Sequence, residues 1–235
     1  MTPEARSLRP VTWPCPTSAV ASDRDTVDEF AMACDRARAA RLLIVPALFD
    51  EANRMRRFTI ELMRRLDHAG IDSFLPDLPG TNESLQALNG VTVEHWQAAV
   101  DTATRHFAAT AVLGVRGGSL LTPDHLPQWH YAPVKGAAIL RQMLRARMLS
   151  ARESGREEQR EALETAARNS GIILSGHALA AGFYCAFETA APSPSATVIE
   201  QAQVGGAGLW LRAEPDEDAG QCARLAAILS QAMLP

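Results

Sequence analysis

A glycine-rich turn directly after a hydrophobic run holds the residues whose spacing is most specific for chemistry. The run is 111–115, and the turn has the pattern Gly-x-Arg-x-Gly with Arg116 at its centre. Small residues on either side of a central residue allow a tight turn that presents the central side chain at the end of a strand. A serine there would be a nucleophile, but a guanidinium stays protonated and cannot attack a carbonyl carbon. The turn therefore predicts a presented side chain that has no nucleophilic role.

Ser119, three residues after Arg116, is the candidate for a displaced nucleophile. Its surroundings, 117–121, read Gly-Gly-Ser-Leu-Leu and lack the second glycine of the turn pattern. The favoured interpretation is that Ser119 caps or ends the turn. Cys185 falls on an apolar predicted helix, where a buried structural thiol is the expected role.

The histidines are placed unfavourably for a catalytic triad. They are His68, His95, His106, His125, His130 and His177. In hydrolases with a Gly-x-Ser-x-Gly turn, the histidine comes last, from a loop after the final strands. The corresponding loop here, 203–208, has no general base, and the acids Asp216 and Asp218 orient nothing without an imidazole. Only His177 or His125, supplied from elsewhere, remains a candidate partner for Ser119.

The loop 46–53 adds carboxylates close to the glycine-rich turn. Their negative charge would oppose a developing oxyanion, so the loop does not predict an oxyanion hole. In one interpretation, Arg116 binds a small anionic ligand through paired hydrogen bonds. In the other, the guanidinium pairs with Asp50, Glu51 or Asp77 and holds the loops together, because a buried arginine needs a partner. The expected ligand-binding set is Arg116, Asp50, Glu51, Asn53 and Arg56, with His177 beside it.

Strands that alternate with helices must position these residues. This order predicts an α/β fold with a mainly parallel sheet and helices on both faces. Residues 1–40 are predicted to form an N-terminal arm and a short helix through Val27, Phe30, Ala31 and Cys34, and residues 41–235 to form the main domain. The predicted strands are 42–46, 73–76, 111–115, 172–174, 196–200 and 209–212. The predicted helices are 54–69, 93–108, 137–151, 156–168, 178–188 and 218–233.

Several motifs resemble the exosortase-A-associated α/β-hydrolase-like family, in particular the second of its two types. They are the Glu-x-Asn-x-x-Arg-Arg segment from Glu51, the Pro-Asp-Leu-Pro-Gly loop from Pro76, the turn centred on Arg116, and the segments 132–136, 174–177 and 208–210. The resemblance covers roughly residues 41–235. It implies an α/β-hydrolase fold and a role near bacterial exopolysaccharide production and exosortase-dependent sorting. This sequence departs from the family where the segment after the turn is shortened.

Composition excludes several classes of function. The net charge is −4 and the pI about 5.9, which argues against nucleic-acid binding. Asp124, His125 and His130 match no established metal spacing, so we predict neither a metal nor another cofactor. The scattered cysteines, the lack of an apolar leader and the lack of a membrane-length apolar run predict a cytoplasmic protein without a transmembrane segment.

Three functions follow, in order of preference. The first is a non-hydrolytic binding or accessory protein, a pseudoenzyme whose partner includes a small anionic ligand. The second is an atypical serine hydrolase or acyltransferase that uses Ser119. The third is an interaction scaffold that works through helices 137–170. The arginine-rich face of 141–152 could meet an acidic partner or lipid headgroups, although Glu153, Glu157 and Glu158 favour a solvated face.

Overall fold

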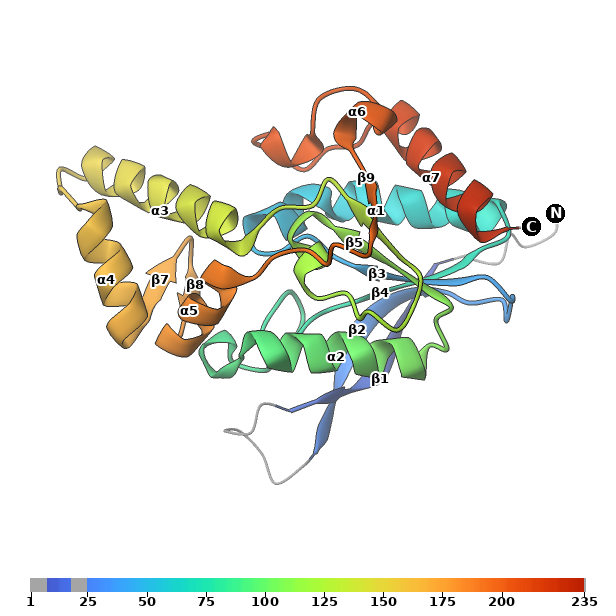
Figure 1. Ribbon diagram of the computed structural model, residues 1–235, viewed down its shortest axis with the longest axis horizontal. Coiled ribbons are helices and arrows are strands. Elements are labelled where there is room, and N and C mark those ends of the chain that lie inside the picture. Colours follow the sequence, from blue (N-terminus) through green and yellow to red (C-terminus); the bar gives the residue numbers. More distant parts are fainter. Residues whose placement is uncertain (1–7, 18–24, 235) are drawn as a thin grey trace.

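A twisted sheet between helices, with a helical unit extending from one end, makes up the fold (Figure 1). The computed structural model describes residues 8–17 and 25–234. The seven-stranded sheet has the order β1-β2-β4-β3-β5-β6-β9. Its strands are β1 (Arg9–Pro16), β2 (Thr26–Cys34), β3 (Arg41–Val45), β4 (Asp72–Pro76), β5 (Ala111–Val115), β6 (Gln128–Tyr131) and β9 (Thr197–Ile199).

Within this sheet, β4, β3, β5, β6 and β9 are parallel to one another, whereas β1 and β2 run antiparallel to their neighbours. Parallel strands need helical crossovers, which cover both faces of the sheet. Helices α1 (Asp50–His68) and α7 (Ala219–Met233) cover one face, and α2 (Val93–His106) lies on the other. The predicted α/β fold with a mainly parallel sheet is therefore confirmed.

The alternation of β3 shows how the sheet separates two cores. Leu42 and Ile44 pack in the cluster that includes α1 and α7, whereas Leu43 and Val45 pack in the cluster that includes α2. All four side chains are fully buried. A run that is apolar at every position is thus explained by burial on both faces.

A helical unit, here called the cap (residues 136–189), is inserted between β6 and β9. It projects from the end of the sheet at which the parallel strands β3 and β5 terminate (Figure 1). Its elements are α3 (Gly136–Glu153), α4 (Arg160–Ser170), β7 (Ile172–Leu174), β8 (His177–Leu179) and α5 (Ala181–Thr189). The remaining short elements are η1 (Leu88–Gly90), η2 (Arg116–Leu120), α6 (Gln201–Val204) and η3 (Leu209–Leu211).

The helix predicted through Val27, Phe30, Ala31 and Cys34 is wrong. Thr26–Cys34 is the strand β2, which pairs with β1 and β4 in the main sheet. Burial follows the two-residue period of a strand: Ala31 and Ala33 are buried, whereas Phe30 is 41% exposed. Residues 9–16 of the predicted arm form β1, and 1–7 and 18–24 lie outside the described residues.

Other differences lie in the second half of the chain. Ile172–Leu174 is a strand, but it pairs with His177–Leu179 in a separate two-stranded sheet of the cap. The helix predicted from 178 begins at Ala181. The strand predicted at 209–212 is the 3₁₀ turn η3, closed by hydrogen bonds from Leu211 N to Gly208 O and from Arg212 N to Leu209 O. Within the described ranges, no helix is long and apolar enough to cross a membrane.

Candidate functional site

Arg116 lies in a sharp turn at the carboxyl end of β5, where its backbone adopts a φ of 53°. This left-handed region is uncommon for any residue with a side chain. The flanking glycines explain how the turn fits. A Cβ on Gly118 would lie 2.4 Å from the carbonyl oxygens of Val45 and Pro46, and a Cβ on Gly114 would lie 2.6 Å from Ser119 Cα. The turn therefore packs directly against β3 and requires glycine at both positions.

The Arg116 side chain forms a two-pronged ion pair with Glu51 in the first turn of α1. Nε and Nη2 each donate to one Glu51 carboxylate oxygen at 3.0 Å, and Nη1 donates to the Ala132 carbonyl at 2.8 Å. Both side chains are buried, with exposed fractions of 12% and 7%. Parallel N–H···O bonds of this kind are charge-assisted and fix the geometry of both partners.

Trp210 of η3 covers the Arg116 guanidinium. The guanidinium carbon of Arg116 lies 4.0 Å from the Trp210 ring centroid, which is the geometry of a cation–π contact. Arg54 Nη1 donates to the Trp210 carbonyl at 3.1 Å and ties η3 to α1. We call Arg116, Glu51, the Ala132 carbonyl and Trp210 the arginine clasp.

The other predicted site residues do not join the clasp. Asp50 Oδ1 lies 3.5 Å from His177 Nε2, whose ring also packs edge-on against Phe49. Arg56 donates to Asp77 at 3.1 Å, at the carboxyl end of β4, and Asn53 is exposed on α1. The structure therefore brings together Arg116 and Glu51 from the predicted set.

Ser119 lies in a setting that does not activate a hydroxyl. It is buried in η2, and its Oγ donates to the Gly114 carbonyl at 3.1 Å, the bond expected of a residue that closes a turn. Among the described residues, no imidazole forms a hydrogen bond with it. His177 faces Asp50, and His125 lies on the surface with its Nδ1 3.6 Å from Asp101. Neither candidate histidine is positioned as a base for Ser119.

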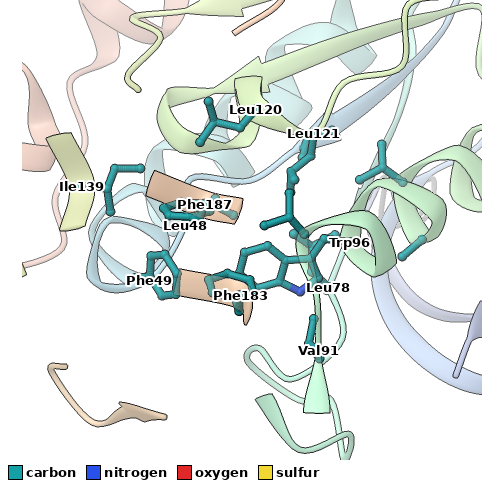
Figure 2. Close-up of a cluster of buried hydrophobic side chains, with 14 of the residues drawn as sticks. Leu48, Phe49, Leu78, Val91, Trp96, Leu120, Leu121, Ile139, Phe183 and Phe187 are labelled. Atoms are coloured by element: carbon teal, nitrogen blue, oxygen red, sulfur yellow. The ribbon is translucent and has the colours of Figure 1, made fainter. Parts of the chain in front are cut away.

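Apolar side chains fill the space between the sheet and the cap. Figure 2 shows Phe49, Trp96, Phe183 and Phe187 packed together, with Leu48 beside Phe187. The ring centroids of Trp96 and Phe183 lie 5.1 Å apart, and those of Phe49 and Phe187 lie 5.5 Å apart. The cavity next to this cluster is about 60 Å³. Pockets for drug-sized ligands measure about 300–1,000 Å³, so this space holds no ligand of that size.

A buried polar network under the shortened segment was not expected from the sequence. Thr122 Oγ1 is 2.7 Å from His130 Nε2 and donates to Gln128 Oε1 at 2.5 Å. Burial lowers the pKa of His130 to about 4, with a smaller opposing effect from Asp124. Asp124 accepts from Ser193 at 2.7 Å and from Gln128 at 3.0 Å. The alternation of polar and aromatic residues along β6 was the available signal, but three nearby prolines argued against a strand.

The strand order, the strained turn after β5 and the cap after β6 together define an α/β-hydrolase fold. In that plan the residue at the centre of the turn is the nucleophile. In this chain Arg116 occupies the central position. Among solved structures, the protein is similar to α/β-hydrolase domain-containing protein 10 from mouse, with a TM-score of 0.54 and 11% identity over 94% of this chain and 98% of that one. At this identity the likeness shows the fold alone.

Two further neighbours are described as hydrolases. The α/β-hydrolase GrgF from Penicillium sp. sh18 has a TM-score of 0.48 and 14% identity, over 77% of this chain and 72% of that one. A putative hydrolase from Agrobacterium vitis S4 has a TM-score of 0.43 and 14% identity, over 62% of this chain. This chain spans 61% of the length of the Agrobacterium protein. No protein-family model and no curated protein matches the sequence.

Proposed function

We propose that this protein is a non-hydrolytic binding or accessory protein built on the α/β-hydrolase fold. The arginine clasp is the observation that supports the proposal. The nucleophile position holds a guanidinium, which is already bound by both oxygens of Glu51. A guanidinium that stays protonated in this way neither attacks a carbonyl carbon nor accepts a proton.

The surroundings of the clasp support the same proposal. Acyl transfer needs a nucleophile, a base and donors that stabilise an oxyanion. In place of the base the C-terminal loop supplies Trp210, and in place of neutral oxyanion donors α1 begins with Asp50 and Glu51. The Ser119 hydroxyl donates a hydrogen bond to the Gly114 carbonyl, and within the described residues it forms none with the clasp.

The biological setting of the proposal rests on the motif resemblance. On that basis we assign the protein to a bacterial exopolysaccharide or exosortase-linked system, and the scattered free thiols support a cytoplasmic location. A co-purification experiment with tagged protein tests this, because an accessory protein should recover components of that system. Recovery of none of them from cells that make the polysaccharide would argue against the assignment.

Labelling with a fluorophosphonate probe tests the loss of serine chemistry. We expect no labelling of the folded protein, because the hydroxyl of Ser119 is buried and has no base. The variant Ser119→Ala is the informative comparison, and Ser195→Ala, which removes an exposed hydroxyl, is its matched control. Labelling that disappears only in Ser119→Ala would make the protein an atypical serine hydrolase or acyltransferase.

The anionic ligand stays a prediction attached to the same guanidinium. Three of its five N–H groups are used within the clasp, so an added carboxylate or phosphate would accept from the remaining two while Glu51 and the Ala132 carbonyl keep the others. Calorimetric titration with inorganic phosphate measures this binding. Arg116→Lys keeps the charge but loses the paired geometry, so binding that is equal in both proteins would reject Arg116 as the anion site.

A further inference from the structure

Several exposed arginines in the described part of the chain are neutralised by a carboxylate on the same helix or loop. Arg64 pairs with Glu61, Arg105 with Asp101, Arg160 with Glu164 and Arg212 with Asp216. The helix α3 differs. Its exposed arginines are Arg141, Arg145 and Arg152, and within residues 8–17 and 25–234 none of them forms an ion pair.

These three arginines lie on one face of α3. Their spacing of four and seven residues brings them into a single stripe, because an α-helix turns once in 3.6 residues. The stripe lies opposite the buried positions Ile139 and Met143, so it faces solvent. At about 1.5 Å per residue it is about 16 Å long. We call this surface the α3 stripe: Arg141, Arg145, Leu149 and Arg152.

Two acidic residues near the stripe have other partners, and Glu153, the only acidic residue of α3, offsets one of the three positive charges. Glu158 binds Arg147, on the other side of α3, through both carboxylate oxygens at 2.8 Å. Glu157 accepts from Gln159. Arg141 and Arg145 are also one helical turn apart, where like charges repel each other. The stripe is therefore a local excess of positive charge on a chain whose net charge is −4.

Leu149 adds an exposed apolar side chain to the stripe. Its side chain is 59% exposed among the arginines, and no aromatic residue occurs anywhere in α3. The helix runs from the end of the sheet to the far end of the cap, where a loop joins it to α4 (Figure 1). The three arginines are spread over about 16 Å of one helix face, so they do not converge on one small anion. A broad negative surface fits them better.

We propose that the α3 stripe docks on the surface of a bilayer that contains anionic phospholipids. The arginines bind lipid phosphates, and Leu149 enters the boundary between headgroups and acyl chains. A stable protein partner would need about 800 Å² on each side and would be anchored by aromatic residues, which α3 lacks. The proposal is independent of the proposed function, because it uses no residue of the clasp.

Co-sedimentation with lipid vesicles tests the proposal. The full chain is mixed at low salt with vesicles of equal parts phosphatidylglycerol and phosphatidylcholine, or with phosphatidylcholine alone. The test variant is R141Q/R145Q/R152Q. Its matched control is R64Q/R105Q/R160Q, which removes the same charge from exposed arginines of α1, α2 and α4. Thermal unfolding of both variants verifies that they are folded.

We expect the unmodified protein to bind the anionic vesicles and not those of phosphatidylcholine alone. The partition coefficient of the stripe variant should be lower by about tenfold or more, because each arginine near the surface adds to the electrostatic attraction. The control variant should bind within about twofold of the unmodified protein, and high salt should release all three. Leu149→Ser should weaken binding at intermediate salt.

Two results would overturn the proposal. One is that the unmodified protein does not sediment with anionic vesicles, which would leave an acidic protein as the partner of the stripe. The other is that the control variant loses as much binding as the stripe variant, which would show that total charge rather than α3 determines the attraction.

Discussion

Two regions of this molecule use arginine in opposite ways. At the carboxyl end of β5, Arg116 is buried, bonded to both oxygens of Glu51 and covered by Trp210. On the outer face of α3, Arg141, Arg145 and Arg152 are exposed and without an ion pair in the described chain. A charge in the first region is costly to leave unpaired, because it is largely shielded from water. In the second region, water solvates the charge at little expense.

The comparison separates a structural charge from an available one. A buried guanidinium with three of its five N–H groups already bonded stabilises the fold, and it offers a ligand the two that remain. An exposed guanidinium contributes almost nothing to stability, and its whole charge is open to a partner. Residue type alone therefore does not tell which of the two arginine sets binds something.

The largest expected effect is that of Arg116→Met. Removal of the guanidinium leaves the Glu51 carboxylate buried without its partner, which should lower the free energy of unfolding by about 3–5 kcal/mol. Urea denaturation measures it. The double variant E51Q/R116M should recover part of this loss, because it no longer buries a lone charge. A loss below about 1 kcal/mol would place Arg116 with the exposed arginines and so remove the contrast between the regions.

His130 extends the comparison to pH. Burial holds the pKa of the folded imidazole at about 4, whereas an ordinary histidine titrates near 6.5. Between these values the unfolded chain binds the proton and the folded chain does not, so stability is full above pH 6.5 and falls as the pH approaches 4. The gap between the two pKa values corresponds to about 3 kcal/mol.

The control for this prediction is His130→Gln. Carboxylates and surface histidines contribute to the pH dependence of both proteins, so the difference between their unfolding free energies isolates His130. We expect that difference to change by up to about 3 kcal/mol across the window. Parallel pH profiles for the two proteins would show that the buried imidazole titrates normally.

Gly118→Ala tests the backbone that holds Arg116 in place. The added methyl group would lie 2.4 Å from two carbonyl oxygens of the β3 region, so the turn must move. We expect a loss of about 1–3 kcal/mol, measured by urea denaturation. Gly182→Ala is the matched control, because it lies in helix α5 with no atom within 4 Å of the added methyl. That change should be neutral or slightly stabilising, and equal losses for both would refute the argument.

The smallest effect is expected on α3. The variant R141Q/R145Q/R152Q should change the free energy of unfolding by less than about 0.5 kcal/mol, because solvated groups without partners are replaced by other solvated groups. We expect a slight rise in the free energy of unfolding, since a like-charge pair is removed. A loss of several kcal/mol would show that the stripe supports the fold and is not free for a partner.

Much of the fold was predictable because the central strands carry a strong signal. β3 and β5 are continuous apolar runs, and α1, α2 and α3 have clear helical periods, so the parallel core followed from pattern alone. β2 was missed because Val27, Phe30, Ala31 and Cys34 also satisfy a helical spacing. Whether the segment follows the two-residue period of a strand depends on its pairing with β4, and that pairing is a tertiary property.

The site was predictable in type but not in pairing. The spacing around Arg116 located the turn and excluded a nucleophile. Three carboxylates were possible partners, however, and only the position of the first turn of α1 selects Glu51. Trp210 was missed because its segment was interpreted as a strand. The network around His130 depends on β6, whose four residues lie among prolines that weaken any strand prediction.

The glycines around Arg116 bear on how enzymes are recognised from sequence. Gly114 and Gly118 are demanded by close approach to Ser119 and to the β3 carbonyls, whatever side chain sits between them. A search that scores only such glycines detects the shape of the turn and gives no information about catalytic activity. The central residue alone carries the chemistry, so a classifier that weights it separately would distinguish working enzymes from proteins that share only their framework.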